Sequence, residues 1–206
     1  MYSLATYNCH NFKSNFNKTF KNKRYNFYNR ALASCEFNLK DKGRGRPCGG
    51  KMWPVKKGIK TLACYELKSN IMAISVELGN GKSLQIYGVW LKSDDNSSES
   101  LEYFQSNLLM LESEIKNNIE KKQPFIIMGD WNADIKDYLD SKNVGYTYRN
   151  GGYKALIDHI VWFKNESDFK MVDVMICNNN DNSSDDLPIT IIVNVDLGVK
   201  DEFKQI

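Results

Sequence analysis

Residues 129–134, Gly-Asp-Trp-Asn-Ala-Asp, combine a carboxylate and a carboxamide two positions apart, directly after an apolar run. The run at 125–129 is predicted to be a fully buried strand. At the end of such a strand, Asp130 and Asn132 can point into the same cleft. Asp130 could take a proton from water or hold a nucleophile, and Asn132 could hydrogen-bond a phosphate oxygen without repelling it. The alternative is a turn that only closes a loop, since Asp and Asn favour turns.

Three other segments of the chain place polar groups at or near predicted strands. Asp158 and His159 follow each other within an apolar stretch, so strand alternation puts them on opposite faces. An Asp flanked by apolar residues on a strand needs a partner or a polar site. Asn8 ends the first predicted strand, and Asp185 lies in a polar loop before the last one. Each of them alone is also compatible with an ordinary turn or strand-end residue.

Hydrophobic patterns predict the elements that must position these groups. The runs typical of strands are 3–8, 52–56, 71–78, 84–91, 125–129, 156–163, 171–177 and 189–195. Asn80-Gly81 predicts a tight hairpin, whereas residues 10–30 show no clean period. Residues 99–120 are predicted to form a helix capped by Ser98. Its apolar face consists of Leu101, Phe104, Leu108, Leu111 and Ile115. Many strands and one strong helix predict two packed sheets with helices outside, an α/β sandwich.

Length and composition bound the class of protein. The chain has 206 residues, of which 42% are hydrophobic, so we expect a single domain over residues 1–206 with a sizeable core. A formal net charge of +3 leaves nucleic acid possible as a partner without arguing for it. Basic residues gather in 12–60, and acidic ones in 94–102 and 181–186. That division suits a metal-dependent enzyme acting on phosphodiesters, but the charge alone favours the interpretation of ordinary surface charge.

The cysteines and the apolar segments predict a location. The five cysteines are odd in number and none has CxxC spacing, which argues against a disulfide framework and against a zinc site. Free thiols are typical of a reducing compartment. The N-terminus has no basic leader followed by a long apolar run, and no apolar stretch approaches the ~20 residues that span a bilayer. We therefore expect an intracellular protein, nuclear or cytoplasmic, without a membrane partner.

The order of the motifs along the chain is informative in itself. After Asn8 come GRPCGG at 45–50, VWL at 89–91, GDWNAD at 129–134, IDHI at 157–160 and SDDLPI at 184–189. This series resembles the endonuclease/exonuclease/phosphatase superfamily, which includes deoxyribonuclease I, abasic-site endonucleases and retrotransposon endonucleases. YNCHNFKSN near the start, GRPCGG and GDWNAD make the chain most similar to the endonuclease domains of non-LTR retrotransposons. The resemblance covers nearly all of residues 4–195.

The resemblance implies a four-layer α/β/β/α sandwich of the deoxyribonuclease I type, with the site at one end of the two sheets. It implies that Asn8 helps to bind the metal or the phosphate, and that Asp130 and Asn132 orient the attacking water and hold the phosphate. By the same resemblance, Asp158 supports a catalytic His and Asp185 lies close to the metal. The implied reaction is hydrolysis of phosphodiesters in DNA, assisted by Mg²⁺ or Mn²⁺.

Two departures from the superfamily concern groups that would contact the phosphate. Its final Ser-Asp-His motif ends here in Asp186. An ionised Asp186 only accepts hydrogen bonds and repels a phosphate, so loss of the His is expected to slow the reaction by orders of magnitude. Trp90 stands where the superfamily usually has a phosphate-binding Tyr, and it offers an N–H but no hydroxyl. Of the two His residues, His159 is predicted to face away from the cleft, whereas His10 shares parity with Asn8 but is equally compatible with a loop position.

A third departure is a shorter N-terminal part. After its first Asn the superfamily has a helix and then a strand ending in Gln-Glu, and that Glu is its main metal ligand. No Gln-Glu pair precedes residues 45–50 here, and Glu36 is the only Glu in that part. We therefore expect the fold to lack one helix and one strand near the N-terminus, which leaves an unpaired edge or a gap in the core.

Three hypotheses stay open on the sequence. The chain is a working metal-dependent phosphodiesterase, a decayed domain with weak or lost catalysis, or a non-catalytic module that binds DNA. Binding of the third kind should weaken steeply with salt. It would use basic residues of the N-terminal part, namely Lys13, Lys18, Lys21, Lys23, Arg24, Arg44 and Arg46.

Overall fold

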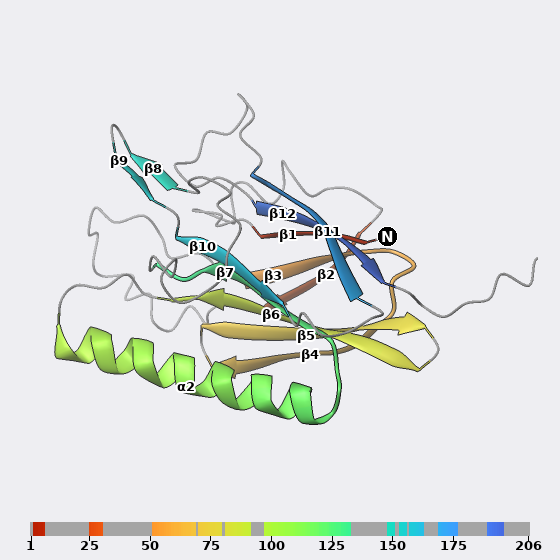
Figure 1. Cartoon of the computed structure of the whole chain (residues 1–206), viewed down its shortest axis with the longest axis horizontal. Helices are drawn as coiled ribbons and strands as arrows, with labels where there is room; N and C mark the ends of the chain where they lie inside the picture. The colour runs from red at the N-terminus through yellow and green to blue at the C-terminus, as the bar shows by residue number, and fades with distance from the viewer. Residues whose placement is uncertain are drawn as a thin grey trace, which may run out of the picture.

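A mixed five-stranded sheet lies at the centre of the protein (Figure 1). The computed structural model describes residues 2–6, 25–30, 51–68, 70–79, 81–91, 97–132, 148–150, 153–155, 157–162, 169–176 and 189–195. The central strands, in the order β10-β7-β6-β5-β4, are Asp158–Trp162, Phe125–Asp130, Lys82–Trp90, Ile71–Gly79 and Thr61–Lys68. All neighbouring pairs are antiparallel except β6 and β7, which are parallel and are connected through α2 (Ser98–Glu120). Among the helices in these ranges, none is both long and apolar enough to cross a membrane.

A second layer packs against the face of the central sheet opposite α2 (Figure 1). Its strands are β1 (Tyr2–Thr6), β2 (Tyr25–Arg30), β3 (Lys51–Lys56), β11 (Phe169–Ile176) and β12 (Ile189–Val195). β12 lies between β1 and β11 in one antiparallel sheet, and β2 pairs with β3 in another. A short hairpin of β8 (Tyr148–Asn150) and β9 (Tyr153–Ala155) forms a separate sheet. The predicted α/β sandwich is confirmed.

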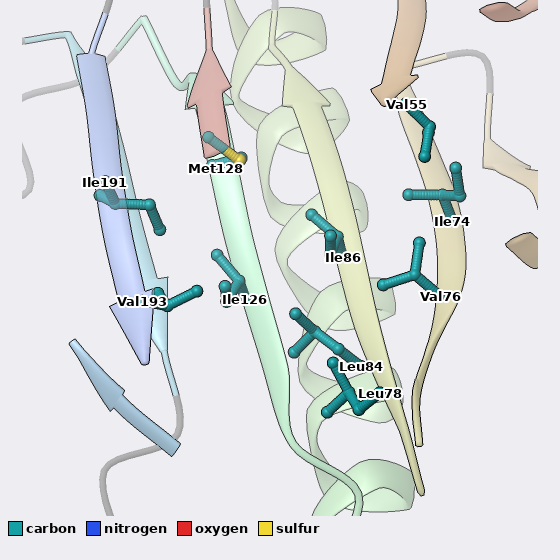
Figure 2. Packing of buried hydrophobic residues seen from close by; sticks show 10 residues of the cluster. All are labelled: Val55, Ile74, Val76, Leu78, Leu84, Ile86, Ile126, Met128, Ile191 and Val193. Atoms are coloured by element: carbon teal, nitrogen blue, oxygen red, sulfur yellow. The ribbon is translucent and has the colours of Figure 1, made fainter. Parts of the chain in front are cut away.

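Two apolar clusters hold the layers together, because alternate residues of the central strands point to opposite faces. In β7, Ile126 and Met128 pack toward the second layer (Figure 2), whereas Phe125 and Ile127 pack toward Leu111 of α2. All six residues of β7 are buried, as predicted for a strand that is covered on both faces. The predicted hairpin between β5 and β6 is also present, with Gly81 at a positive φ of 74° in its two-residue turn.

The strands of the second layer form two separate sheets in the described ranges. Within the described ranges, β1 pairs only with β12 and β3 only with β2, so no strand joins the two sheets. Residues 7–24 and 31–50 lie outside the described residues, so the predicted loss of a helix and a strand stays a prediction. The sequence does not predict β2, β4, β8 or β9. β4 lies at the edge of its sheet and has two register shifts, so its buried and exposed residues do not alternate cleanly. β8 and β9 have only three residues each.

The helix α2 differs from its prediction in its cap and in its buried face. Ser97, not Ser98, caps the helix, and its hydroxyl oxygen accepts a hydrogen bond from the Ser100 N–H at 3.1 Å. Leu101 and Leu108 belong to the predicted apolar face, yet they are 55% and 37% exposed. The buried residues of the helix are Ser100, Asn107, Leu111 and Asn118. The helix therefore turns a partly polar side toward the sheet, which its apolar periodicity does not predict.

Two buried asparagines on this side of α2 are expected to respond oppositely to truncation. The Asn118 amide donates to the Tyr87 hydroxyl at 2.6 Å and to the Glu114 carbonyl at 2.8 Å. The Asn107 amide donates to the Tyr103 carbonyl at 2.8 Å, but its Oδ1 has no hydrogen-bond partner among the described residues. Because an unpaired buried polar atom costs about 1–3 kcal/mol, Asn107→Ala should leave the free energy of unfolding unchanged or raise it by about 1 kcal/mol. Asn118→Ala should lower it by about 1–2 kcal/mol. Urea unfolding at pH 7 measures both, and equal losses would contradict the assignment.

The Tyr87 hydroxyl predicts a loss of stability in alkali. It donates to Glu114 Oε2 at 3.0 Å, and burial, with Glu114 adding to the effect, raises the pKa of Tyr87 well above its usual 10.0. The raised pKa means that the protonated form is the one stabilised by folding. This contribution is complete below about pH 10 and is lost as the pH rises through the folded-state pKa. Between pH 9 and pH 11 the wild type should therefore lose more unfolding free energy than Tyr87→Phe. Parallel pH profiles for the two proteins would contradict this.

Candidate active site

Three of the predicted site residues form one row across the central sheet. Asp130 ends β7, and the register pairs it with Trp90 at the end of β6 and with Asp158 at the start of β10. Residues that are directly paired point to the same face of a sheet. In β7 that face also carries Ile126 and Met128, which pack between the two layers. The row Trp90–Asp130–Asp158 therefore faces the second layer, at one end of the sheet.

Backbone hydrogen bonds continue past the strand ends and hold this row in place. The Leu91 N–H donates to the Asp130 carbonyl at 2.9 Å, and the Trp131 N–H donates to the Ile157 carbonyl at 2.8 Å. Asp130 and Asp158 are buried, with 5% and 4% of their surfaces exposed. Two carboxylates are thus directly opposite each other on adjacent strands, where the fold fixes their spacing.

Asn132 is not an extension of the strand, which corrects the geometry expected from alternation. Its φ of 48° is left-handed, a conformation that Asn tolerates better than most residues. Its backbone N–H donates to Asp130 Oδ1 at 2.9 Å, and its side-chain amide donates to the Leu91 carbonyl at 2.6 Å. The motif therefore forms an Asp–Asn turn, and its chemical role stays a prediction. The turn orients the Asp130 carboxylate, and one amide hydrogen of the partly exposed Asn132 remains for another acceptor.

Gly129 explains why the motif begins with glycine. Its φ of 141° lies in a region that L side chains rarely adopt. A Cβ at this position would overlap the carbonyl oxygen of Val89, its register partner on β6. The close approach of β6 and β7 just before Asp130 therefore depends on the absence of a Cβ atom at Gly129.

His159 lies on the opposite face from the row. It pairs with Gly129, one position away from Asp158, and is buried. Its ring meets Trp131 edge-on, with 6.5 Å between ring centroids and 82° between planes. Trp131 belongs to the apolar cluster beneath α2. The prediction that His159 faces away from the cleft is confirmed, so it does not replace the missing His of the final motif.

The other predicted site residues, Asn8, Asp185 and Asp186, lie outside the described residues, as do His10 and Glu36. Within the described ranges, no three His, Cys, Asp or Glu side chains come close enough to hold a metal ion. A metal bound at the row would therefore need further ligands from the remaining segments.

Comparison with known proteins decides the fold. No protein-family model matches the chain, and no curated protein is significantly similar in sequence. Among solved structures, TDP2 of D. rerio, complexed with a single-strand DNA product, aligns with a TM-score of 0.63 at 15% identity, covering 94% of this chain and 86% of that one. The human Nocturnin catalytic domain with bound sulfate aligns with 0.60 at 14%, covering 94% and 80%. The 3′ phosphatase NExo from Neisseria, bound to a product DNA hairpin, aligns with 0.60 at 9%, covering 93% and 99%.

The chain has the deoxyribonuclease I-like fold. The three proteins are members of the endonuclease/exonuclease/phosphatase superfamily, so the superfamily's fold is confirmed for this chain. The resemblance to retrotransposon endonucleases in particular stays a prediction. The row Trp90–Asp130–Asp158 lies at one end of the central sheet of this fold, and its role as the active site stays a prediction.

Two residues beside the row have no place in the sequence prediction. The Trp90 N–H donates to the Asn70 carbonyl at 2.9 Å, which continues the β5–β6 register by one pair. Trp53 of β3 lies against Gly88, two positions before Trp90, where an added Cβ would be 2.9 Å from its ring. In the sequence, Asn70 is a lone polar residue before an apolar run and Trp53 is one aromatic residue of a short strand. The register places Asn70 opposite Trp90, and the contact with Gly88 places Trp53 near it.

Proposed function

We propose that the chain hydrolyses phosphodiester bonds in DNA with the help of a divalent metal ion, at a rate reduced by the loss of the His in its final motif. The observation that carries the proposal is the row of Asp130 and Asp158 beside Trp90, at one end of a deoxyribonuclease I-like fold. Two of the three structurally similar proteins were solved with DNA products, which supports DNA as the substrate.

The two carboxylates suit a hard divalent cation. Like charges directly opposite each other on adjacent strands destabilise a sheet, and a bound cation relieves this repulsion. Carboxylate oxygens are also the preferred ligands of Mg²⁺ and Mn²⁺. Asp130 and Asp158 would hold the ion together with the predicted ligands Asn8 and Asp185. The ion would supply charge neutralisation at the phosphate and at the leaving oxygen.

The chain's own groups can bind and orient the other reactants. Asp130, fixed by the Asn132 N–H through Oδ1, can accept a proton from water through its other oxygen. The remaining amide hydrogen of Asn132 can donate to a phosphate oxygen without adding charge. The Trp90 indole offers an N–H but no hydroxyl, so the phosphate contact of the superfamily's Tyr is expected to be weakened or lost. No described His is positioned to protonate the leaving oxygen, since His159 points to the other face.

The test is nicking of supercoiled plasmid in Mg²⁺ or Mn²⁺, with EDTA as the control. Slow nicking that requires the metal supports the proposal. If the protein binds plasmid with an affinity that falls steeply with added salt, but never nicks the plasmid, the result would contradict hydrolysis. It would favour the non-catalytic DNA-binding module.

Restoring the missing His should raise the rate. Asp186→His replaces a group that repels the phosphate by one that can donate a proton, and we expect nicking to accelerate by about 10-fold or more. Asp186→Asn is the matched control, because it removes the charge without supplying a proton donor of suitable pKa. Equal acceleration by both variants would mean that charge repulsion alone, and not the lost proton donor, limits the rate.

A further inference from the structure

The polar row extends by one residue beyond the positions that the sequence identifies. Ile71 pairs with Val89, and the hydrogen bond from the Trp90 N–H to the Asn70 carbonyl adds the next pair of this antiparallel ladder. Asn70 is therefore directly opposite Trp90. Because paired residues share a face, the register places Asn70 on the side of the sheet that carries Asp130.

Asn70 also matches the row in its burial. It is 5% exposed, the same fraction as Asp130. Asn is among the residues that are mostly exposed in proteins, and a buried carboxamide needs partners for its donors and its acceptor. The next residues along the same face, Met72, Ile74 and Val76, are buried and apolar. A carboxamide thus stands at the end of an apolar strand face, beside the site.

We propose that Asn70 is a phosphate-binding residue of this site, with its amide N–H donating to an oxygen of the substrate's phosphodiester. The inference rests on the proposed function and deepens it. A carboxamide has two N–H donors and an acceptor, so Asn70 can keep a protein partner and still donate to a phosphate. A neutral donor is suited to this place, because a Lys or an Arg would compete with the metal for the carboxylates of Asp130 and Asp158. Asn70 would also supply a hydrogen-bond donor beside Trp90, the position at which this chain lacks the hydroxyl of the superfamily's Tyr.

Steady-state nicking by Asn70→Ala and Asn70→Ser tests the proposal. Hydrogen bonds to charged groups are the strong ones, so Asn70→Ala should raise KM by about 10-fold to 100-fold with a smaller change in kcat. Asn70→Ser, which keeps a short donor, should recover part of the loss. Asn118→Ala is the matched control, a buried Asn beneath α2 whose loss should lower stability and leave KM unchanged. An Asn70→Ala protein with wild-type KM would overturn the proposal.

Binding separates the failure of this inference from the failure of the proposed function. Fluorescence anisotropy of a labelled single-stranded oligonucleotide is measured in Ca²⁺, which suits oxygen ligands, with each variant checked by thermal melting. If the wild type binds but never nicks, and Asn70→Ala weakens binding about 10-fold, then the hydrolysis is refuted and Asn70 stands as a phosphate-binding residue. If Asn70→Ala and Asn118→Ala bind like the wild type, the assignment of Asn70 is refuted whatever the nicking assay shows.

Discussion

Asp130→Asn is expected to reduce metal-dependent nicking by about 100-fold or more, because general-base catalysis contributes about 10²–10⁴-fold. The substitution keeps the shape of the side chain. Its Oδ1 can still accept the hydrogen bond from the Asn132 N–H, so the turn that follows β7 should persist. What disappears is the negative charge that, in the proposed mechanism, would accept a proton from water and hold a cation. The measurement is the initial rate of plasmid nicking in Mg²⁺.

The same substitution should not destabilise the protein, which separates a chemical loss from a folding loss. Asp130 and Asp158 are buried and directly opposite each other, so removal of one charge relieves their repulsion. We expect a melting temperature equal to or above that of the wild type in EDTA. Asp173→Asn, at an exposed carboxylate on β11, is the matched control and should change neither property. Nicking by Asp130→Asn within a few-fold of the wild-type rate would place the chemistry elsewhere.

The sequence predicts the central sheet well because its strands are covered on both faces. β7 is a continuous apolar run, and β5 and β6 are apolar runs joined by a turn that Asn-Gly specifies. It also predicts that Asp158 and His159 separate onto two faces, since alternation needs no knowledge of neighbouring strands. The order of GDWNAD and IDHI along the chain indicates the fold, and the register then brings Asp130 and Asp158 together.

The unpredicted parts depend on contacts between distant segments. The sequence cannot place Asn70 opposite Trp90, because that pairing follows from the β5–β6 register. The buried side of α2 is partly polar, because Asn118 donates a hydrogen bond to Tyr87 on β6. A prediction from apolar periodicity alone therefore places the buried face of the helix at a different rotation about its axis. The alternation rule also fails at Asn132, where the strand has ended and the Asp130 carboxylate caps a turn. At α2 and at Asn132, a specific hydrogen bond overrides the average pattern.

Gly129→Ala is expected to be the most destabilising single-methyl substitution near the site. The strain of a φ of 141° in a residue with a side chain costs about 1–3 kcal/mol. The new Cβ would also overlap the Val89 carbonyl oxygen and lie 2.9 Å from the Val89 nitrogen, both of which are backbone atoms of β6. Neither can rotate away, so β6 and β7 must separate. We expect a total loss above about 4 kcal/mol and a melting temperature lower by about 10 °C or more.

The control distinguishes the clash from the positive φ alone. Gly58 and Gly81 have φ values of 98° and 74°, and nothing lies within 4 Å of a Cβ added to either. Gly58→Ala and Gly81→Ala should therefore cost only the backbone strain, about 1–2 kcal/mol. If Gly129→Ala melts within a few degrees of these two variants, β6 and β7 do not approach as described. If it melts far below them, the glycine of the motif is explained by strand packing, and Asp130, the next residue along, is left as the position at which chemistry is tested.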